Sequence, residues 1–249
     1  GKFRLRQKMT FIHDEEEFAS LAASNLENTL KRLEKLVSKA LKGGFWKMLN
    51  QQIVDRHQRG EVKVLSPEEL KEILDGERLA QGVSSSYVHA PGKTTPFRLI
   101  CDSATKIKPI DASIAATNMA PRVNLQNFIN IITAVRSLSS LITLDVQRAY
   151  YAVIIDEVQS FLFCTPWVSE PKKYGMARKF AIRCLTLAFG MGSAGNSLQC
   201  GMVVFGVQQL LLAAAKYILE KLTFVDNINA ADTNTGTAVE CAGDIIRGL

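Results

Sequence analysis

The chain has 249 residues, of which 47% are hydrophobic and 22% charged, the ordinary composition of a soluble globular protein. This length allows one large domain or two small ones, and the sequence holds no internal repeat or long disordered tract. The formal net charge of +6 and the isoelectric point of about 9.1 suit nucleic acid as a partner without requiring it.

Cysteine usage and hydropathy exclude several other classes of protein. The five cysteines have no paired spacing, and an odd number of them in apolar runs indicates reduced, buried thiols of an intracellular protein, cytoplasmic or nuclear. The three histidines lie too far apart in the sequence for a zinc pattern. We find no signal peptide, and residues 198–220, the one segment to test as a membrane span, carry two glutamines at their centre. We therefore expect a core helix there and no membrane partner.

Helices dominate the first 80 residues. A charged helix with a narrow apolar stripe is predicted over 14–42, where a Gly-Gly pair ends it, and a second helix over 46–59. The Ser-Pro-Glu-Glu sequence at 66–69 supplies a cap, a first-turn proline and first-turn acids, so a short helix begins there. Residues 80–96 are rich in Ser, Gly, Thr and Pro and predict a loop.

The rest of the chain interleaves strands with helices. Strands are expected at 97–101, in the apolar run 141–144 (as a buried strand), at 160–165, at 179–187 and on both sides of a turn at 226–227; helices are expected over 123–138, over 198–220 and from about 232. This order of elements indicates an α+β fold, with an antiparallel sheet backed by two long helices.

Two acidic residues each follow an apolar strand. Asp145 ends the run 141–144, and Asp226 ends the run 222–225. If the two strands are neighbours, the carboxylates meet and offer the hard oxygen ligands that Mg²⁺ prefers. Two such ions, about 3.5–4 Å apart, clamp the attacking and leaving oxygens in phosphoryl transfer. The spacing leaves open the alternative that both acids only cap strand ends or turns.

Five segments in a fixed order resemble the fingers and palm of reverse transcriptases. The sequence DVQRAY at 145–150 is similar to the first palm motif, and FVDN at 224–227 to the aromatic-x-Asp-Asp hairpin. Two further segments, 25–60 and 87–91 with 97–106, resemble the fingers of retrotransposon enzymes, especially the BEL/Pao group. The last, 187–199, resembles the substrate-binding turn of the palm and the helix that follows it. The likeness covers most of residues 25–249.

This resemblance implies the architecture. It implies a polymerase palm, an antiparallel sheet backed by helices, with a fingers subdomain of helices and strands and with the thumb absent. The implied divisions are an N-terminal extension with the start of the first helix at 1–24, a fingers-like subdomain at 25–122, and a palm-like subdomain with the catalytic hairpin at 123–249, cut before the thumb.

The resemblance also implies the catalytic groups. Asp145 and Asp226 would be catalytic and, with the main-chain carbonyl of Val146, would hold two Mg²⁺ ions, for which Mn²⁺ could substitute. Asn227 departs from the family, which has a second acid at that position. An amide brings no charge, so metal binding is expected to be reduced or altered.

Five further residues take nucleotide-binding roles by resemblance. Tyr150 would select deoxynucleotides by clashing with a 2′-hydroxyl, and Arg98 would lie against the triphosphate, which suits a planar guanidinium. Lys93 would add a second phosphate contact, and Gln199 and Phe189 would line the pocket for template and nucleotide. Simpler alternatives stay open: a core tyrosine, a surface salt bridge and a solvated lysine.

Two hypotheses of function follow. In the first, the chain is an RNA-directed DNA polymerase domain cut from a longer polyprotein. Its partners would be an RNA or DNA template–primer duplex, deoxynucleoside triphosphates and a protein that supplies the missing thumb, and alone it would be weak or inactive. In the second, it is a reverse-transcriptase-like domain that has lost catalysis and serves as a nucleic-acid-binding or scaffold module in a larger assembly.

Overall fold

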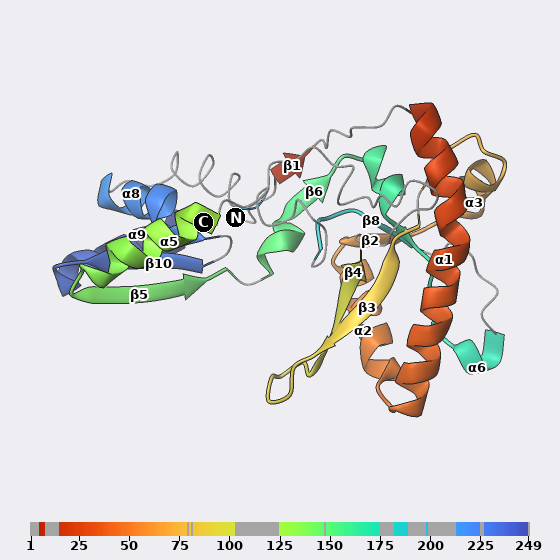
Figure 1. Ribbon diagram of the computed structural model, residues 1–249, viewed down its shortest axis with the longest axis horizontal. Coiled ribbons are helices and arrows are strands. Elements are labelled where there is room, and N and C mark those ends of the chain that lie inside the picture. The colour runs from red at the N-terminus through yellow and green to blue at the C-terminus, as the bar shows by residue number, and fades with distance from the viewer. Residues whose placement is uncertain are drawn as a thin grey trace. The chain divides into compact units, whose positions relative to one another are not determined.

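The computed structural model describes residues 5–7, 15–78, 80, 82–102, 125–146, 148–174, 182–188, 198, 213–224 and 227–248. The chain divides into two compact units (Figure 1). Unit 1 comprises residues 1–5, 120–153 and 193–249, and unit 2 comprises residues 6–119 and 154–192.

Unit 1 contains a three-stranded antiparallel sheet in the order β5 (Ser140–Asp145), β10 (Asn227–Asp232), β9 (Thr223–Phe224). Its other elements are α5 (Leu125–Arg136), the 3₁₀ helix η1 (Ala149–Ala152), α8 (Ala213–Lys221) and α9 (Thr235–Gly248). The central strand β10 lies against α8 and α9 (Figure 1). The expected antiparallel sheet with helices behind it is present.

One face of this sheet is buried. The cross-strand pairs Leu144–Ile228 and Ile142–Ala230 belong to an apolar core that also takes in α8 and α9. The buried helical residues of that core are Ala215, Ile218, Cys241, Ala242 and Ile245. Successive side chains of a strand point to opposite faces, so Asp145 points away from this core and is exposed.

The apolar run 141–144 is not a buried strand, which corrects the prediction from hydrophobicity alone. Leu141 is 51% exposed, whereas Ile142 and Leu144 pack against the core. Three of the four residues of the run are apolar, but only one face of β5 has helices against it. A continuous apolar run therefore misstates the burial when a sheet is covered on one side only.

Unit 2 is built on two helices and a β-hairpin. Its elements in chain order are β1 (Leu5–Gln7), α1 (Glu15–Lys42), α2 (Trp46–Gln58), β2 (Val62–Val64), α3 (Pro67–Leu74), β3 (Ser84–His89), β4 (Phe97–Asp102), β6 (Val153–Ile155), the 3₁₀ helix η2 (Gln159–Phe163), β7 (Cys164–Thr165), α6 (Pro171–Tyr174) and β8 (Ile182–Cys184). The first residues of β1 and β6, Leu5 and Val153, are counted in unit 1. The antiparallel hairpin β3–β4 has α1 beside β3 (Figure 1). Strands β2, β8 and β7 form a second antiparallel sheet in that order, and β1 pairs with β6.

The core of unit 2 joins the two helices to the hairpin. Trp46 and Trp167 stack with ring centroids 4.8 Å apart. Their indole N–H groups donate to the Ser169 carbonyl at 3.2 Å and to the Asn50 amide oxygen at 2.9 Å, so both rings are buried with their polar atoms satisfied. Around them pack Leu33, Leu36, Val37, Ala40, Phe45, Leu49, Ile53, Leu99, Val168 and Ile182.

The predicted helices are confirmed more closely than the predicted strands. Helices α1 and α2 match the expected ranges within one residue at each end. The loop predicted over 80–96 is wrong in its first half, because Ser84–His89 pairs with β4 along its whole length. The strand predicted over 160–165 is mostly the 3₁₀ helix η2. In the part of the chain that the structure describes, no helix has both the length and the hydropathy of a membrane span.

The predicted cap of the third helix is present as a full capping box. The Glu69 N–H donates to the Ser66 hydroxyl at 3.2 Å, and the Ser66 N–H donates to the Glu69 carboxylate at 2.9 Å. Each bond satisfies a donor that the start of a helix would otherwise leave without a partner.

We expect Ser66→Ala to lower the free energy of unfolding by about 1 kcal/mol, because the cap of α3 is lost. Urea denaturation measures the change. Thr95→Ala, in the exposed loop between β3 and β4, removes a hydroxyl outside any helix and should change stability by less than about 0.5 kcal/mol. Equal losses for the two variants would contradict a role for the capping box.

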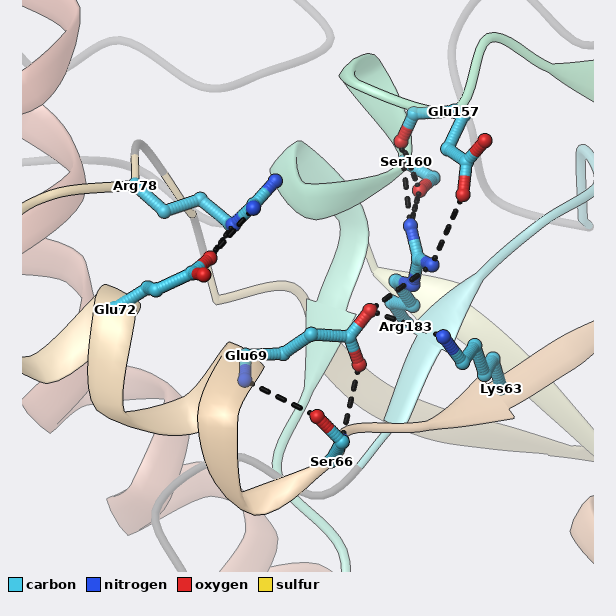
Figure 2. A network of polar contacts seen from close by, with 8 residues as sticks. All are labelled: Lys63, Ser66, Glu69, Glu72, Arg78, Glu157, Ser160 and Arg183. Atoms are coloured by element: carbon cyan, nitrogen blue, oxygen red, sulfur yellow. Dashed lines mark hydrogen bonds and ion pairs between the residues drawn. The ribbon is translucent and has the colours of Figure 1, made fainter.

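Arg183, on β8, is the centre of a polar network that joins three elements of unit 2 (Figure 2). Its side chain is 3% exposed. The guanidinium lies 3.1 Å from the Glu69 carboxylate of α3, donates to the Ser160 hydroxyl of η2 at 2.8 Å, and lies 3.6 Å from the Glu157 carboxylate. These partners satisfy the two terminal nitrogens of the buried guanidinium, whereas its Nε is buried without a hydrogen-bond partner among the described residues.

Glu69 links this network to the capping box. Its carboxylate also accepts from the Lys63 ammonium at 3.1 Å (Figure 2). Partial burial by itself raises the pKa of Glu69, but the Ser66 N–H, the Lys63 ammonium and the Arg183 guanidinium outweigh it and hold that pKa below its ordinary value. Glu69 is therefore ionised in the folded protein at neutral pH.

Candidate functional site

Asp145 lies at the end of β5, on the open face of the unit 1 sheet. The β5–β10 register places Asn227 directly opposite it. Directly opposed residues of an antiparallel pair have Cα atoms about 4.5–5.5 Å apart. Asp145 and the start of β10 are thus brought together, although β9, the strand that leads into Asp226, is not the neighbour of β5, because β10 lies between them.

Asp226 lies outside the described residues. Its neighbour Asn227 pairs with both Asp145 and Phe224, so residues 225–226 link β9 to β10 at this point. The close approach of the Asp145 and Asp226 carboxylates, expected within about 6 Å for shared metal ions, stays a prediction. Among the described residues alone, no group of three or more His, Cys, Asp or Glu side chains could hold a metal ion.

Val146 follows Asp145 directly and is partly buried against the core of unit 1. Its carbonyl accepts a hydrogen bond from the Ala149 N–H at 3.3 Å. A carbonyl oxygen has two lone pairs, so this bond still leaves one for a second donor or a cation. The predicted role of this carbonyl as a metal ligand is untested.

The backbone after Asp145 is strained. Arg148 has φ 60° and ψ 30°, the left-handed conformation, and among the described residues no other non-glycine residue has a positive φ. This conformation costs an L-residue roughly 1–2 kcal/mol. The turn that it makes buries Ala149, leaves Tyr150 half-buried and sets the Arg148 guanidinium 5.0 Å from the centre of the Tyr151 ring. Strain of this kind is often found at functional sites, and sequence reasoning did not single out Arg148.

Arg98 lies on β4 of unit 2, and its side chain is exposed. The backbone on both sides of it is held by one amide, because Gln52 of α2 donates to the Phe97 carbonyl at 2.8 Å and accepts from the Leu99 N–H at 3.0 Å. In the part of the chain that the structure describes, Arg98 makes no ion pair, whereas Arg32 makes one with Asp102 at 2.7 Å. The strand is fixed, and the guanidinium is left to solvent.

Lys93 lies in the exposed loop that joins β3 to β4. The loop is closed by the Ala90 N–H, which donates to the Pro96 carbonyl at 2.7 Å, and Gly92 adopts φ 79°. Lys93 and Arg98 therefore belong to one hairpin. The other two predicted pocket residues, Gln199 and Phe189, lie outside the described residues.

A cysteine pair in unit 2 has no counterpart in the sequence prediction. The Cys101 and Cys184 sulfurs lie 3.9 Å apart, and the Arg56 guanidinium lies 3.8 Å from the Cys184 sulfur. The prediction of reduced, buried thiols is confirmed for the four cysteines that the structure describes, Cys101, Cys164, Cys184 and Cys241. The pairing could not be predicted, because 83 positions separate its members.

Comparison with known proteins identifies the fold. No protein-family model matches the sequence, and a search of curated proteins finds no match. The chain is similar to the crystal structure of the prototype foamy virus protease–reverse transcriptase, with a TM-score of 0.50 and 14% identity over 79% of this chain and 21% of that one. It is equally similar to a foamy viral protease–reverse transcriptase in complex with double-stranded DNA, again with a TM-score of 0.50 and 14% identity over 79% of this chain, and 28% of that one. The chain has a reverse-transcriptase-like fold and spans less than a third of the length of either structure.

Proposed function

We propose that this chain is the fingers–palm part of an RNA-directed DNA polymerase from a retrotransposon of the BEL/Pao type. The observation that carries the proposal is the β5–β10 register, in which Asp145 faces the residue next to Asp226. The order of the sequence motifs and the reverse-transcriptase-like fold support it. The retrotransposon assignment rests on the residues of the fingers, at 25–60 and 87–106.

The donor set suits Mg²⁺ or Mn²⁺. Two carboxylates, one main-chain carbonyl and one side-chain amide are all oxygen ligands, which hard divalent cations prefer. Two such ions would supply a clamp on the attacking and leaving oxygens of the nucleotidyl transfer. In this proposal Asp145 and Asp226 hold the ions, and the Val146 carbonyl adds a neutral ligand.

The remaining residues would bind the nucleotide and the template. Tyr150, half-buried beside a strained turn, has a fixed backbone from which to exclude a 2′-hydroxyl. Arg98 and Lys93 present exposed cations on one hairpin, which suits a triphosphate. Phe189 and Gln199 would complete the pocket. A template–primer duplex as partner is supported by the foamy viral enzyme, whose structure contains double-stranded DNA.

A second candidate function is a module that binds nucleic acid or proteins without catalysis. Asn227 favours it, because an amide replaces a charge at the point where β10 faces Asp145. At an effective dielectric near 20, one carboxylate charge about 4 Å from a divalent cation contributes about 8 kcal/mol before desolvation is counted. The amide therefore weakens the site without removing its two other acids.

Asn227→Asp separates the two functions. If the site is otherwise intact, the added carboxylate should tighten Mn²⁺ binding roughly tenfold or more and raise the rate of primer extension on an RNA template. Calorimetry measures the binding, and incorporation of labelled nucleotide measures the extension. Thr233→Asp adds the same charge just beyond the other end of β10 and should change neither. If Asn227→Asp binds no more Mn²⁺ and, in a protein that includes a thumb, extends no primer, the polymerase proposal is wrong.

A further inference from the structure

Three buried side chains meet inside unit 2, outside the proposed catalytic residues. They are Cys101 on β4, Cys184 on β8 and Arg56 on α2, which are 4%, 1% and 6% exposed. The two sulfurs lie 3.9 Å apart, and the guanidinium lies 3.8 Å from the Cys184 sulfur. A guanidinium beside a thiol favours the thiolate, and here the Arg56 guanidinium also lies 3.9 Å from the buried Glu61 carboxylate.

The two thiols differ in acidity. The hydrogen bond from Cys101 and the Arg56 guanidinium lower the pKa of Cys184 despite its burial. The same hydrogen bond, together with burial, raises the pKa of Cys101. Because the Arg56 guanidinium lies 3.8 Å from its sulfur, Cys184 is the member to which we assign the thiolate.

We propose that Cys101 and Cys184 form a reversible disulfide when the protein meets a small hydroperoxide. The Cys184 thiolate attacks one peroxide oxygen and becomes a sulfenic acid, while the other oxygen leaves as hydroxide or alkoxide and takes up a proton. The Cys101 sulfur then attacks the Cys184 sulfur and displaces water. One hydrogen of that water comes from the sulfenic acid and the other from the Cys101 thiol. Two thiols are oxidised, and one peroxide is reduced to water and an alcohol or a second water.

The two sulfurs need to move only a short distance to form a disulfide bond. A disulfide bond is about 2.05 Å long, so the sulfurs must approach by about 2 Å, which side-chain rotation and a small shift of one strand can supply. The bond would tie β4 to β8, two strands that belong to different sheets. Because both thiols are buried, a local opening must precede the reaction, and β8 is only three residues long.

Cys164 lies nearby but is not the partner. In the β7–β8 ladder it pairs with Arg183, so it shares a face with that residue, and Cys184 points to the opposite face. Burial raises the pKa of Cys164, which keeps it a thiol. The pairing is therefore specific to Cys101 and Cys184.

The test is oxidation of the reduced, folded chain by hydrogen peroxide. Of the five thiols counted in denaturant, two should be lost, and a dithiol reductant should restore both. Peptide mapping under non-reducing conditions should find Cys101 linked to Cys184. A different linkage, or sulfinic acid at Cys184 with Cys101 still free, would overturn the proposal.

Variants test the role of each group. Cys101→Ala and Cys184→Ala should abolish the reversible loss of two thiols, whereas Cys241→Ala, in unit 1, should retain it. Measured at pH 5, below the Cys184 pKa of about 6, Arg56→Met should slow the oxidation of Cys184 roughly tenfold for a rise of one pKa unit, because the thiolate is then the minor form. An unchanged rate would exclude the activating role of Arg56. The peptide map of the unaltered chain decides the pairing even if a variant folds poorly.

Discussion

Replacing Asp145 by asparagine is expected to lower the rate of primer extension by about 10³-fold or more in the proposed polymerase. The change removes one charge and keeps the shape, at an exposed position where no packing is lost. A loss of several kcal/mol in stabilisation of the transition state corresponds to this factor. The measurement is single-nucleotide addition to a primer, made in the Asn227→Asp background so that the starting activity is highest.

The matched control for this variant is Asp75→Asn. Asp75 is also an exposed aspartate at the end of an element, the C-terminus of α3, and it lies in unit 2. It should leave both activity and stability unchanged. Equal activity of Asp145→Asn and the parent protein would show that the carboxylate only ends a strand, the structural alternative that the sequence left open.

Replacing Arg183 by methionine is expected to lower the free energy of unfolding by about 3 kcal/mol, the scale of breaking a buried ion pair. The variant keeps an unbranched apolar stem but leaves Glu69 without one of its two cations and Ser160 without its donor. It also removes the guanidinium 4.2 Å from the centre of the Phe161 ring. Both tryptophans of the chain lie in unit 2, so their fluorescence in urea reports this loss.

Arg78→Met is the control for the Arg183 variant. Arg78 lies 4.3 Å from the centre of the same Phe161 ring, but its side chain is 35% exposed. We expect a loss below about 1 kcal/mol, as for other exposed cations. If the two variants lose the same stability, the ring contact and not the buried network determines the effect.

The effect of Arg183 should also depend on pH. The pKa of Glu69 is lowered in the folded protein, so its stabilisation is fully present above the unfolded value, near 4.3, and is lost as the pH falls through the lower folded value. The difference in stability between the parent protein and Arg183→Met should therefore shrink below about pH 4. A difference that stays constant from pH 7 to pH 3 would show that Glu69 is not the partner that matters.

The sequence predicted elements whose signals are local. The cap at Ser66 and the Gly-Gly pair after α1 can each be recognised from a few consecutive residues, and the structure confirms the helices that they delimit. Strand β3 was missed because a run of serines has no hydrophobic alternation, and its pairing with β4 supplies what the local signal lacks. The pairing with β4 therefore outweighs the low strand propensity of the serine run.

The candidate site was predictable only in part. The sequence allowed Asp145 and Asp226 to meet if their strands are neighbours, but β10 lies between β5 and β9, and it is the start of β10 that faces Asp145. The buried polar contacts of unit 2 had no comparable signal in the sequence. Arg56 is 128 positions from Cys184, and Arg183 contacts Ser160 across 23 positions, so only the folded chain brings them together.

The register of β5 against β10 limits how this chain can change in length. All six residues of β5 have a partner on β10, and side chains alternate between the covered and the open face. One extra residue within β5 would turn Asp145 toward the side packed by Ile245 and Ala242, and one within β10 would turn apolar residues of that strand to the open face. Substitutions can accumulate on the open face, but insertions and deletions cannot enter between residues 140 and 145 without moving the carboxylate to the wrong side of the sheet. Related chains should therefore differ in length before Ser140 and after Asp232. Within β5 and β10 they should keep the same number of residues.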